Sequence, residues 1–132
     1  MKLQKLSPIL WTKNLEETTS FYENVLGFNS RSNFPNFVSL FHGDVQIMFV
    51  LPVEDPDDCK DPINNEPFFP EPKMTGDLYI FTDKIDELWE AVQGKAKIKS
   101  AIADRHYAMR DFSILDNNGY ELCFGEDISN RK

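Results

Sequence analysis

Histidine and cysteine are scarce in this chain, since its 132 residues include only two of each. The cysteines, Cys59 and Cys123, have no CxxC spacing and no nearby histidine pair, so the sequence predicts neither a disulfide framework nor a structural zinc site. The histidines, His42 and His106, fall in expected turns or loops, and no serine or cysteine has the context of a nucleophile elbow. We therefore expect two free thiols and no covalent catalysis.

Positive charge and long apolar runs are also lacking. The 14 Lys and Arg residues stand against 22 Asp and Glu, which gives a net charge of −8, and the basic residues are scattered rather than gathered in the patch that nucleic acids require. No run of about 18 uncharged apolar residues could cross a membrane, and no signal-peptide cleavage site is evident. We therefore expect a soluble, cytoplasmic protein without nucleic-acid or membrane partners. The excess of acidic residues has two alternative roles: it would attract cationic ligands, or it would serve only to keep the protein in solution.

The composition, 41% hydrophobic and 27% charged residues, is that of an ordinary globular protein, and for 132 residues we expect one domain, 1–132. Its first half predicts a strand and then a helix, which Asn14 caps with Glu17 three residues on and which Gly27 ends. The predicted apolar face of this helix consists of Leu15, Thr18, Phe21, Tyr22 and Val25. The stretch 36–50 then reads as a hairpin, turned around His42, Gly43 and Asp44.

The second half repeats this plan. The stretch 76–94 predicts a strand and a helix that begins after Asp83 or Lys84 and stops at Gly94. Its predicted apolar face is Ile85, Leu88, Trp89 and Val92. A strand over 96–102, a polar loop over 103–109 and a hairpin over 110–124, turned at 117–119, complete it.

An internal duplication explains why the two halves share the same order of predicted elements. A shift of 70 residues places Thr12 on Thr82 and Leu15 on Ile85, and a shift of 75 places Gln46 on Glu121. Two unrelated segments that share an order of elements are the alternative. We define module one as 1–53, a crossing as 54–74 and module two as 75–132.

The crossing belongs to a stretch, 51–76, that holds six of the eight prolines, so it forms neither a helix interior nor a central strand. It is either a plain tether or a loop whose Phe68 and Phe69 fold over a cleft.

Three segments, "NLEETTSFYENVLGF", "DLYIFTDKIDELW" and "ILDNNGYELCFG", together resemble the glyoxalase/bleomycin-resistance/dioxygenase group, the vicinal oxygen chelate superfamily. The pattern is most similar to its bleomycin-resistance members. The resemblance implies an α+β fold in which duplicated βαβββ modules form a curved mixed sheet around a cleft, with the helices outside. It also implies a homodimer.

In metal-using members of this superfamily, four strand side chains point into the cleft. The resemblance places Ser7, Gln46, Asp77 and Glu121 at those positions. None is a histidine, although imidazole is the usual donor for Fe, Zn, Ni or Mn. Gln46, Asp77 and Glu121 form a weak oxygen set for a harder ion such as Mg or Mn. We therefore expect no metal or other cofactor, and we lean against an enzyme.

The period of two along a strand groups the side chains by face. The strand face that carries Ser7, Gln46, Asp77 and Glu121 has aromatic, sulfur-containing and acidic side chains. On this face Glu121 would point into a wet cleft rather than a dry core. Its predicted ligand-binding residues are Ser7, Trp11, Gln46, Met48, Asp77, Tyr79, Phe81 and Glu121, accompanied by Ile9 and Cys123. The opposite face is apolar and suits packing under the helices: Leu6, Leu10, Ile47, Phe49, Leu78, Ile80, Leu122 and Phe124.

Three functions fit this pattern. The favoured one is a small-molecule-binding protein that sequesters an aromatic or cationic ligand without metal chemistry. The second is a metal-dependent lyase, isomerase or dioxygenase of the same superfamily, with Glu121 as ligand or general base. The third is a non-catalytic dimerisation or regulatory domain whose hollow is filled by its own side chains.

Overall fold

A computed structural model describes residues 1–51, 74 and 76–131. It consists of two compact units, Met1–Glu71 and Pro72–Lys132. Cys59, Phe68, Phe69 and all of the predicted crossing except residue 74 lie outside the described residues. Within the described ranges, no helix has the length and apolar character needed to span a membrane.

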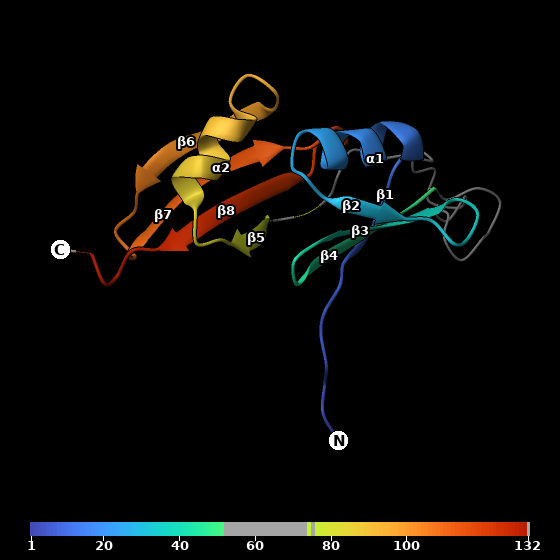
Figure 1. Ribbon diagram of the computed structural model, residues 1–132, viewed down its shortest axis with the longest axis horizontal. Helices are drawn as coiled ribbons and strands as arrows, with labels where there is room; N and C mark the ends of the chain where they lie inside the picture. Colours follow the sequence, from blue (N-terminus) through green and yellow to red (C-terminus); the bar gives the residue numbers. More distant parts are fainter. Residues whose placement is uncertain (52–73, 75, 132) are drawn as a thin grey trace, which may run out of the picture. The chain divides into compact units, whose positions relative to one another are not determined.

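The first unit is one helix on one four-stranded sheet. Its elements are β1 (Ile9–Trp11), α1 (Leu15–Asn24), β2 (Asn29–Arg31), β3 (Phe37–His42) and β4 (Val45–Val50). The strand order is β1-β4-β3-β2, with β1 parallel to β4 and the other pairs antiparallel. The helix α1 lies on one face of this sheet (Figure 1).

The predicted cap of α1 is confirmed, and so is the burial of Tyr22, Ile47 and Phe49. The Asn14 side chain accepts a hydrogen bond of 3.0 Å from the backbone N–H of Glu17, which satisfies a donor that the first helical turn leaves unpaired. Tyr22 of α1 is fully buried, and its ring centroid lies 5.4 Å from that of Phe49 on β4. Because Val38 pairs with Phe49, and Leu40 with Ile47, these strands present their apolar faces to the helix.

Two expectations in this unit are wrong. Leu6 was expected under the helix, but it is 92% exposed because β1 begins only at Ile9, so the strand alternation does not extend to it. His42 was expected in the turn, but it is the last residue of β3. Its exposed ring packs at 5.5 Å from that of Phe28, and the turn itself contains Gly43 and Asp44.

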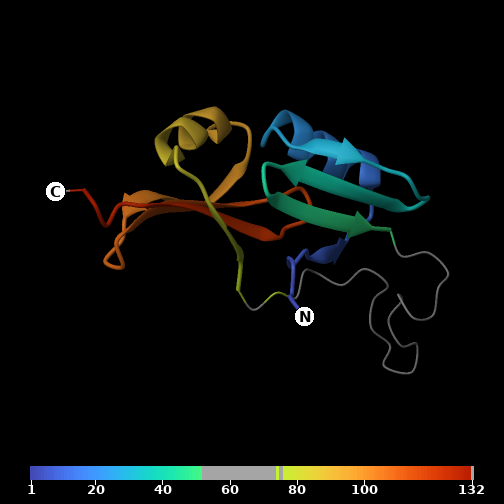
Figure 2. The ribbon, with the colours of Figure 1, turned by 60° about the horizontal axis from the view of Figure 1, so that its bottom comes forward.

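The second unit repeats the arrangement. Its elements are β5 (Leu78–Phe81), α2 (Ile85–Val92), β6 (Lys97–Asp104), β7 (Met109–Leu115) and β8 (Glu121–Asp127). The strand order is β5-β8-β7-β6, with β5 parallel to β8 and the others antiparallel. Figure 2 shows α2 on one side of the sheet that β6, β7 and β8 form. The order βαβββ therefore occurs twice, and the predicted α+β fold class is confirmed.

The helix α2 is capped differently from α1. Lys84 occupies the N-cap position as one of the two predicted alternatives, but its side chain makes no capping bond. A carboxylate from β8 takes that role, since Glu126 Oε1 accepts from the N–H of Ile85 at 3.0 Å. Ile85 and Val92 are fully buried, and the Trp89 ring packs 5.0 Å from that of Phe112.

Candidate functional site

Each sheet has a face that its own helix does not cover, which we call its open face. In the first unit the open face contains Ile9 and Trp11 of β1, with Gln46 and Met48 of β4, because Ile9 pairs with Met48 and side chains alternate along a strand. In the second unit, register places Tyr79 of β5 beside Cys123 of β8 and Ser113 of β7.

A short hydrogen-bond network holds Gln46 on the first open face. Its Oε1 accepts from Ser7 Oγ at 2.9 Å and from Lys5 Nζ at 2.5 Å. Its Nε2 donates to Ser39 Oγ at 2.7 Å. Ser39 pairs with Met48 across the β3–β4 ladder, so adjacent strands orient the amide. Both ends of Gln46 are therefore engaged.

Aromatic rings and carboxylates share the second open face. The ring centroids of Tyr79 and Phe81 lie 5.2 Å apart, and Phe81 is 70% exposed. Strand alternation places Glu121, and the exposed Asp77 just before β5, on the same side. Glu121 forms an ion pair with Lys99 at 3.1 Å. This face thus combines an exposed apolar surface with negative charge.

Asp111, near the start of β7, is the centre of the polar cluster on this face. It is only 3% exposed, and its carboxylate accepts three side-chain hydrogen bonds. Its Oδ2 accepts from Tyr79 Oη and from Tyr107 Oη, each at 2.9 Å, while its Oδ1 accepts from Arg105 Nε at 2.7 Å. These bonds compensate for the cost of burying a carboxylate.

Arg105 is positioned by the tight connection between β6 and β7. Its Nη2 donates to Ser100 Oγ at 3.1 Å and to the carbonyl of Ala101 at 2.9 Å. The connection closes with Ala108 at φ 64, in the left-handed region that is unfavourable for a residue with a Cβ. This strained turn brings Arg105 and Tyr107 from one loop to the same buried carboxylate.

The cluster changes the protonation behaviour of its members. Burial alone would raise the pKa of Asp111, but the hydrogen bonds from Arg105, Tyr107 and Tyr79 outweigh it and hold the pKa below its usual value. Burial and the bond to Asp111 raise the pKa of Tyr79 far above normal. The bond to Asp111 also raises the pKa of Tyr107. Near neutral pH, Asp111 is therefore ionised and both phenols keep their hydrogens.

Tyr79 reaches Asp111 by crossing β8 at a glycine. Asp111 of β7 pairs with Gly125 of β8, and Tyr79 lies on β5, the other neighbour of β8. A Cβ at position 125 would stand 2.6 Å from Cζ of Tyr79 and still closer to its Oη. The missing side chain of Gly125 is therefore what allows the ring to lie over the strand.

Cys123 and Ser113 lie side by side on the same face. Cys123 is a free, buried thiol. Burial, followed by the charges of Asp111, Asp77 and Glu121, raises its pKa to about 12. The hydroxyl oxygen of Ser113 is buried without a hydrogen-bond partner within the described part of the chain. This thiol is therefore neutral and a weak nucleophile at neutral pH.

The eight predicted site residues divide four and four between the units. Ser7, Trp11, Gln46 and Met48 belong to the first, and Asp77, Tyr79, Phe81 and Glu121 to the second. The structure brings Ser7 into contact with Gln46, and Tyr79 into contact with Phe81.

Sequence reasoning missed Asp111, Arg105, Tyr107 and Gly125. The available signal was polar alternation, because Asp111 and Ser113 interrupt the apolar residues of β7 with a period of two.

The four positions at which the sequence resemblance would place metal ligands do not offer a suitable donor set here. Ser7, Gln46, Asp77 and Glu121 supply no imidazole, which a site for Fe, Ni or Zn ordinarily needs. Gln46 Oε1 and Glu121 Oε1 each already accept from a lysine ammonium, Lys5 and Lys99 respectively. A divalent ion at either oxygen would have to displace that cation, so these residues do not fit such a metal.

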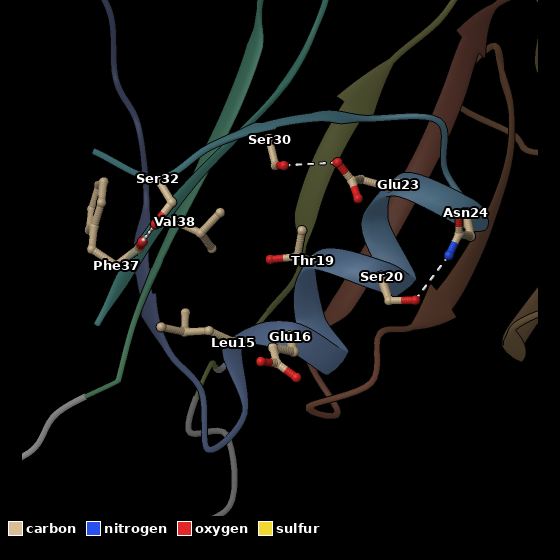
Figure 3. A pocket seen from close by; sticks show the side chains of 10 residues that line it. All are labelled: Leu15, Glu16, Thr19, Ser20, Glu23, Asn24, Ser30, Ser32, Phe37 and Val38. Atoms are coloured by element: carbon tan, nitrogen blue, oxygen red, sulfur yellow. Dashed lines mark hydrogen bonds between the residues drawn. The ribbon is translucent and has the colours of Figure 1, made fainter. Parts of the chain in front are cut away.

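A separate groove of about 380 Å³ runs along α1 in the first unit. Figure 3 shows Leu15, Thr19 and Glu23 lining it from the helix and Ser30 lining it from β2. Its polar groups largely satisfy one another, since Ser30 Oγ donates to Glu23 Oε2 at 2.8 Å and Asn24 Nδ2 donates to Ser20 Oγ at 2.9 Å. None of the eight predicted residues lines this groove.

The double βαβββ order and the two mixed sheets define a protein of the paired-module α+β class. The sequence model of the Glyoxalase/Bleomycin resistance protein/Dioxygenase superfamily matches residues 5–124. The chain belongs to this superfamily, which confirms the resemblance found in its sequence. No curated protein matches the chain.

Solved structures agree on the fold. A glyoxalase/bleomycin resistance protein/dioxygenase from Nocardioides has a TM-score of 0.74 at 18% identity, covering 100% of this chain and 89% of that one. A protein of unknown function from Agrobacterium tumefaciens also scores 0.74, at 16% identity over 96% of this chain and 95% of that one. A lactoylglutathione lyase from the same organism scores 0.67, at 18% identity over 93% and 92%. At these identities the likeness concerns the fold alone.

Proposed function

We propose that this protein binds a small aromatic cation on the open face of its second sheet and acts without metal chemistry. One observation carries the proposal: Phe81 is 70% exposed and its ring lies 5.2 Å from the tilted ring of Tyr79, on a face that also carries Asp77 and Glu121. An exposed ring with a half-buried aromatic neighbour, beside carboxylates, is suited to a flat, positively charged ligand. The lack of an imidazole ligand at Ser7, Gln46, Asp77 and Glu121 supports the proposal that binding involves no metal.

The test is a titration with three flat tricyclic compounds that differ in charge. They are 9-aminoacridine, which is a cation at neutral pH, acridone, which is neutral, and anthracene-9-carboxylate, which is an anion. We expect 9-aminoacridine to bind tightest, as measured by its own fluorescence anisotropy. Equal binding of all three would contradict a role for the carboxylates, and no binding of any would end the proposal.

Matched variants locate the site. Phe81→Ala should weaken 9-aminoacridine binding roughly tenfold through lost stacking, whereas Phe34→Ala, which removes a ring that is 69% exposed in the first unit, should change nothing. Glu121→Gln should weaken binding several-fold, and Glu90→Gln on the exposed surface of α2 serves as its control.

Metal analysis separates this proposal from the enzyme alternative. We expect protein purified without chelator to carry no stoichiometric metal and to bind 9-aminoacridine equally well after treatment with EDTA. Stoichiometric Fe, Ni, Mn or Zn, lost together with binding on chelation, would favour a metal-dependent lyase, isomerase or dioxygenase instead.

The proposal includes a homodimer. The N-terminal segment exposes apolar side chains, with Leu3 at 87%, Leu6 at 92% and Ile9 at 58%, and such exposure favours association. Light scattering should give twice the chain mass of 15.3 kDa. A monomer over the whole accessible concentration range would contradict it.

A further inference from the structure

The hydroxyl groups of Tyr79 and Tyr107 both point their hydrogens at one oxygen. Each donates to Asp111 Oδ2 at 2.9 Å. A phenol has a single hydrogen to donate, and its oxygen can otherwise only accept. With both hydrogens committed to Asp111, the two phenol oxygens can offer a ligand acceptor positions only.

We propose that Tyr79 and Tyr107 select the ligand by this polarity, so that the open face of the second sheet takes cations that carry N–H donors. The ligand class is a primary or secondary ammonium, an amidinium or a guanidinium on an apolar body. The inference rests on the proposed function and specifies the ligand of that same face. Tyr79 and Tyr107 are specificity-determining residues in it, and Asp111 is a positioning residue that acts through them.

The phenol hydrogens are held in place by the burial of Asp111. If either hydroxyl turned to donate to a ligand, a carboxylate with a side chain only 4% exposed would lose one of its donors, and an unsatisfied buried acceptor is costly. Arg105 occupies the other oxygen of Asp111 at 2.7 Å, so it does not replace the lost bond. The cluster therefore resists reversal of its polarity.

The surrounding charges favour the same class of ligand. Arg105 is paired with Asp111, and Lys99 is paired with Glu121, so these four charges largely cancel. Strand register and alternation place three further exposed charges on this face, Asp77, Asp127 and Lys97, and none of them takes part in the ion pairs found among the described residues. Two carboxylates thus stand against one ammonium. The uncompensated charge on the face is therefore negative, and it complements a cation. Tyr107 is 53% exposed, so an incoming group can reach this side chain.

Three ligands built on one benzene ring separate hydrogen bonding from charge. Benzamidine is a cation with N–H donors, phenyltrimethylammonium is a cation without them, and benzoate is an anion. Binding is measured by chemical-shift titration of the ¹⁵N-labelled protein. We expect benzamidine to bind at least tenfold more tightly than phenyltrimethylammonium, and benzoate to bind weakest.

Removal of one phenol oxygen tests the residues. Tyr107→Phe should weaken benzamidine binding roughly tenfold, as loss of a charge-assisted hydrogen bond implies, and should leave phenyltrimethylammonium unchanged. Tyr79→Phe should behave alike. Tyr120→Phe, which removes a hydroxyl in the β7–β8 turn, is the control and should preserve the order of the three ligands. The spectrum of each variant without ligand shows whether it is folded.

The outcomes distinguish this inference from the function on which it rests. Equal binding of benzamidine and phenyltrimethylammonium to the wild type, or no effect of Tyr107→Phe and Tyr79→Phe in folded protein, overturns the selection by phenol oxygens while 9-aminoacridine still binds. Tighter binding of benzoate also overturns it. If 9-aminoacridine and both benzene-ring cations fail to bind, the proposed function and this inference fall together.

Discussion

The ring of Tyr79 lies over Gly125, and this relationship connects three strands of the second sheet. Tyr79 starts on β5, crosses β8 where Gly125 has no side chain, and bonds to Asp111 on β7 at 2.9 Å. Because the crossing depends on the absence of one Cβ, the polar cluster around Asp111 is sensitive to a single methyl group. The predictions below begin with this position.

Gly125→Ala should destabilise the protein by about 1–3 kcal/mol, since the new Cβ forces Tyr79 away from its site in a packed region. Gly76→Ala is the matched control, because a Cβ at Gly76 would meet nothing within 4 Å. Urea denaturation gives the free energy of unfolding of each variant. Equal values for the two variants would show that the Tyr79 ring is not held over the strand.

Asp111→Asn should lower the free energy of unfolding by roughly 2–3 kcal/mol at neutral pH, because it removes the charge that three donors share. The folded-state pKa of Asp111 lies below its ordinary value of 3.8. Its stabilising contribution is therefore fully present above that unfolded-state value and is lost as the pH falls through the lower folded-state pKa. The difference between wild type and Asp111→Asn should be constant above about pH 5 and should shrink below about pH 4.

Denaturation curves from pH 3 to pH 7 measure this difference. Asp77→Asn, an exposed carboxylate on the same face, is the control and should alter stability little at any pH. A difference between wild type and Asp111→Asn that grows on acidification would contradict the assigned role of the ionised carboxylate.

Substitution of the N-cap residue should destabilise α1 but should have almost no effect on α2. Asn14→Ala should cost about 1 kcal/mol because it removes the bond to Glu17 N–H. Lys84→Ala should cost almost nothing, since Lys84 makes no capping bond. Glu126→Ala should destabilise α2 instead, because Glu126 accepts from Ile85 N–H. Thermal denaturation of the three variants checks the order, and a larger effect of Lys84→Ala than of Glu126→Ala would refute it.

Cys123 should be almost unreactive in the folded protein, because burial and nearby carboxylates raise its pKa to about 12 and the thiolate is the reactive form. The variant Cys59→Ser leaves Cys123 as the single thiol. Reaction with Ellman's reagent at pH 8 should be slow in buffer and reach one equivalent rapidly in urea. Rapid reaction of the folded variant would show that the thiol is not shielded.

Sequence patterns predicted the regular parts of the fold because their physical causes are local. The spacing of the apolar residues and the capping residue Asn14 are enough to predict α1. The stretch 117–119 predicts the β7–β8 turn, where Asp116 Oδ1 accepts from Asn118 N–H at 2.8 Å. The strand β2 was harder, since Asn29, Ser30 and Arg31 are all exposed and carry no apolar alternation. This strand forms because β3 offers it an edge, which is a property of the sheet rather than of the segment.

By itself the sequence determined the duplicated order of elements, the faces of the strands and the candidate rings and carboxylates, because these follow from residue type and from periods of two and 3.6 residues. Only the tertiary structure decided that Asp111, and not Glu121, is the buried carboxylate of the second sheet. Strand register and a strained turn at Ala108 bring Tyr79, Arg105 and Tyr107 to Asp111. Glu121 instead meets Lys99 across the sheet. Contacts between residues far apart in sequence depend on register and loop path, and no local pattern encodes them.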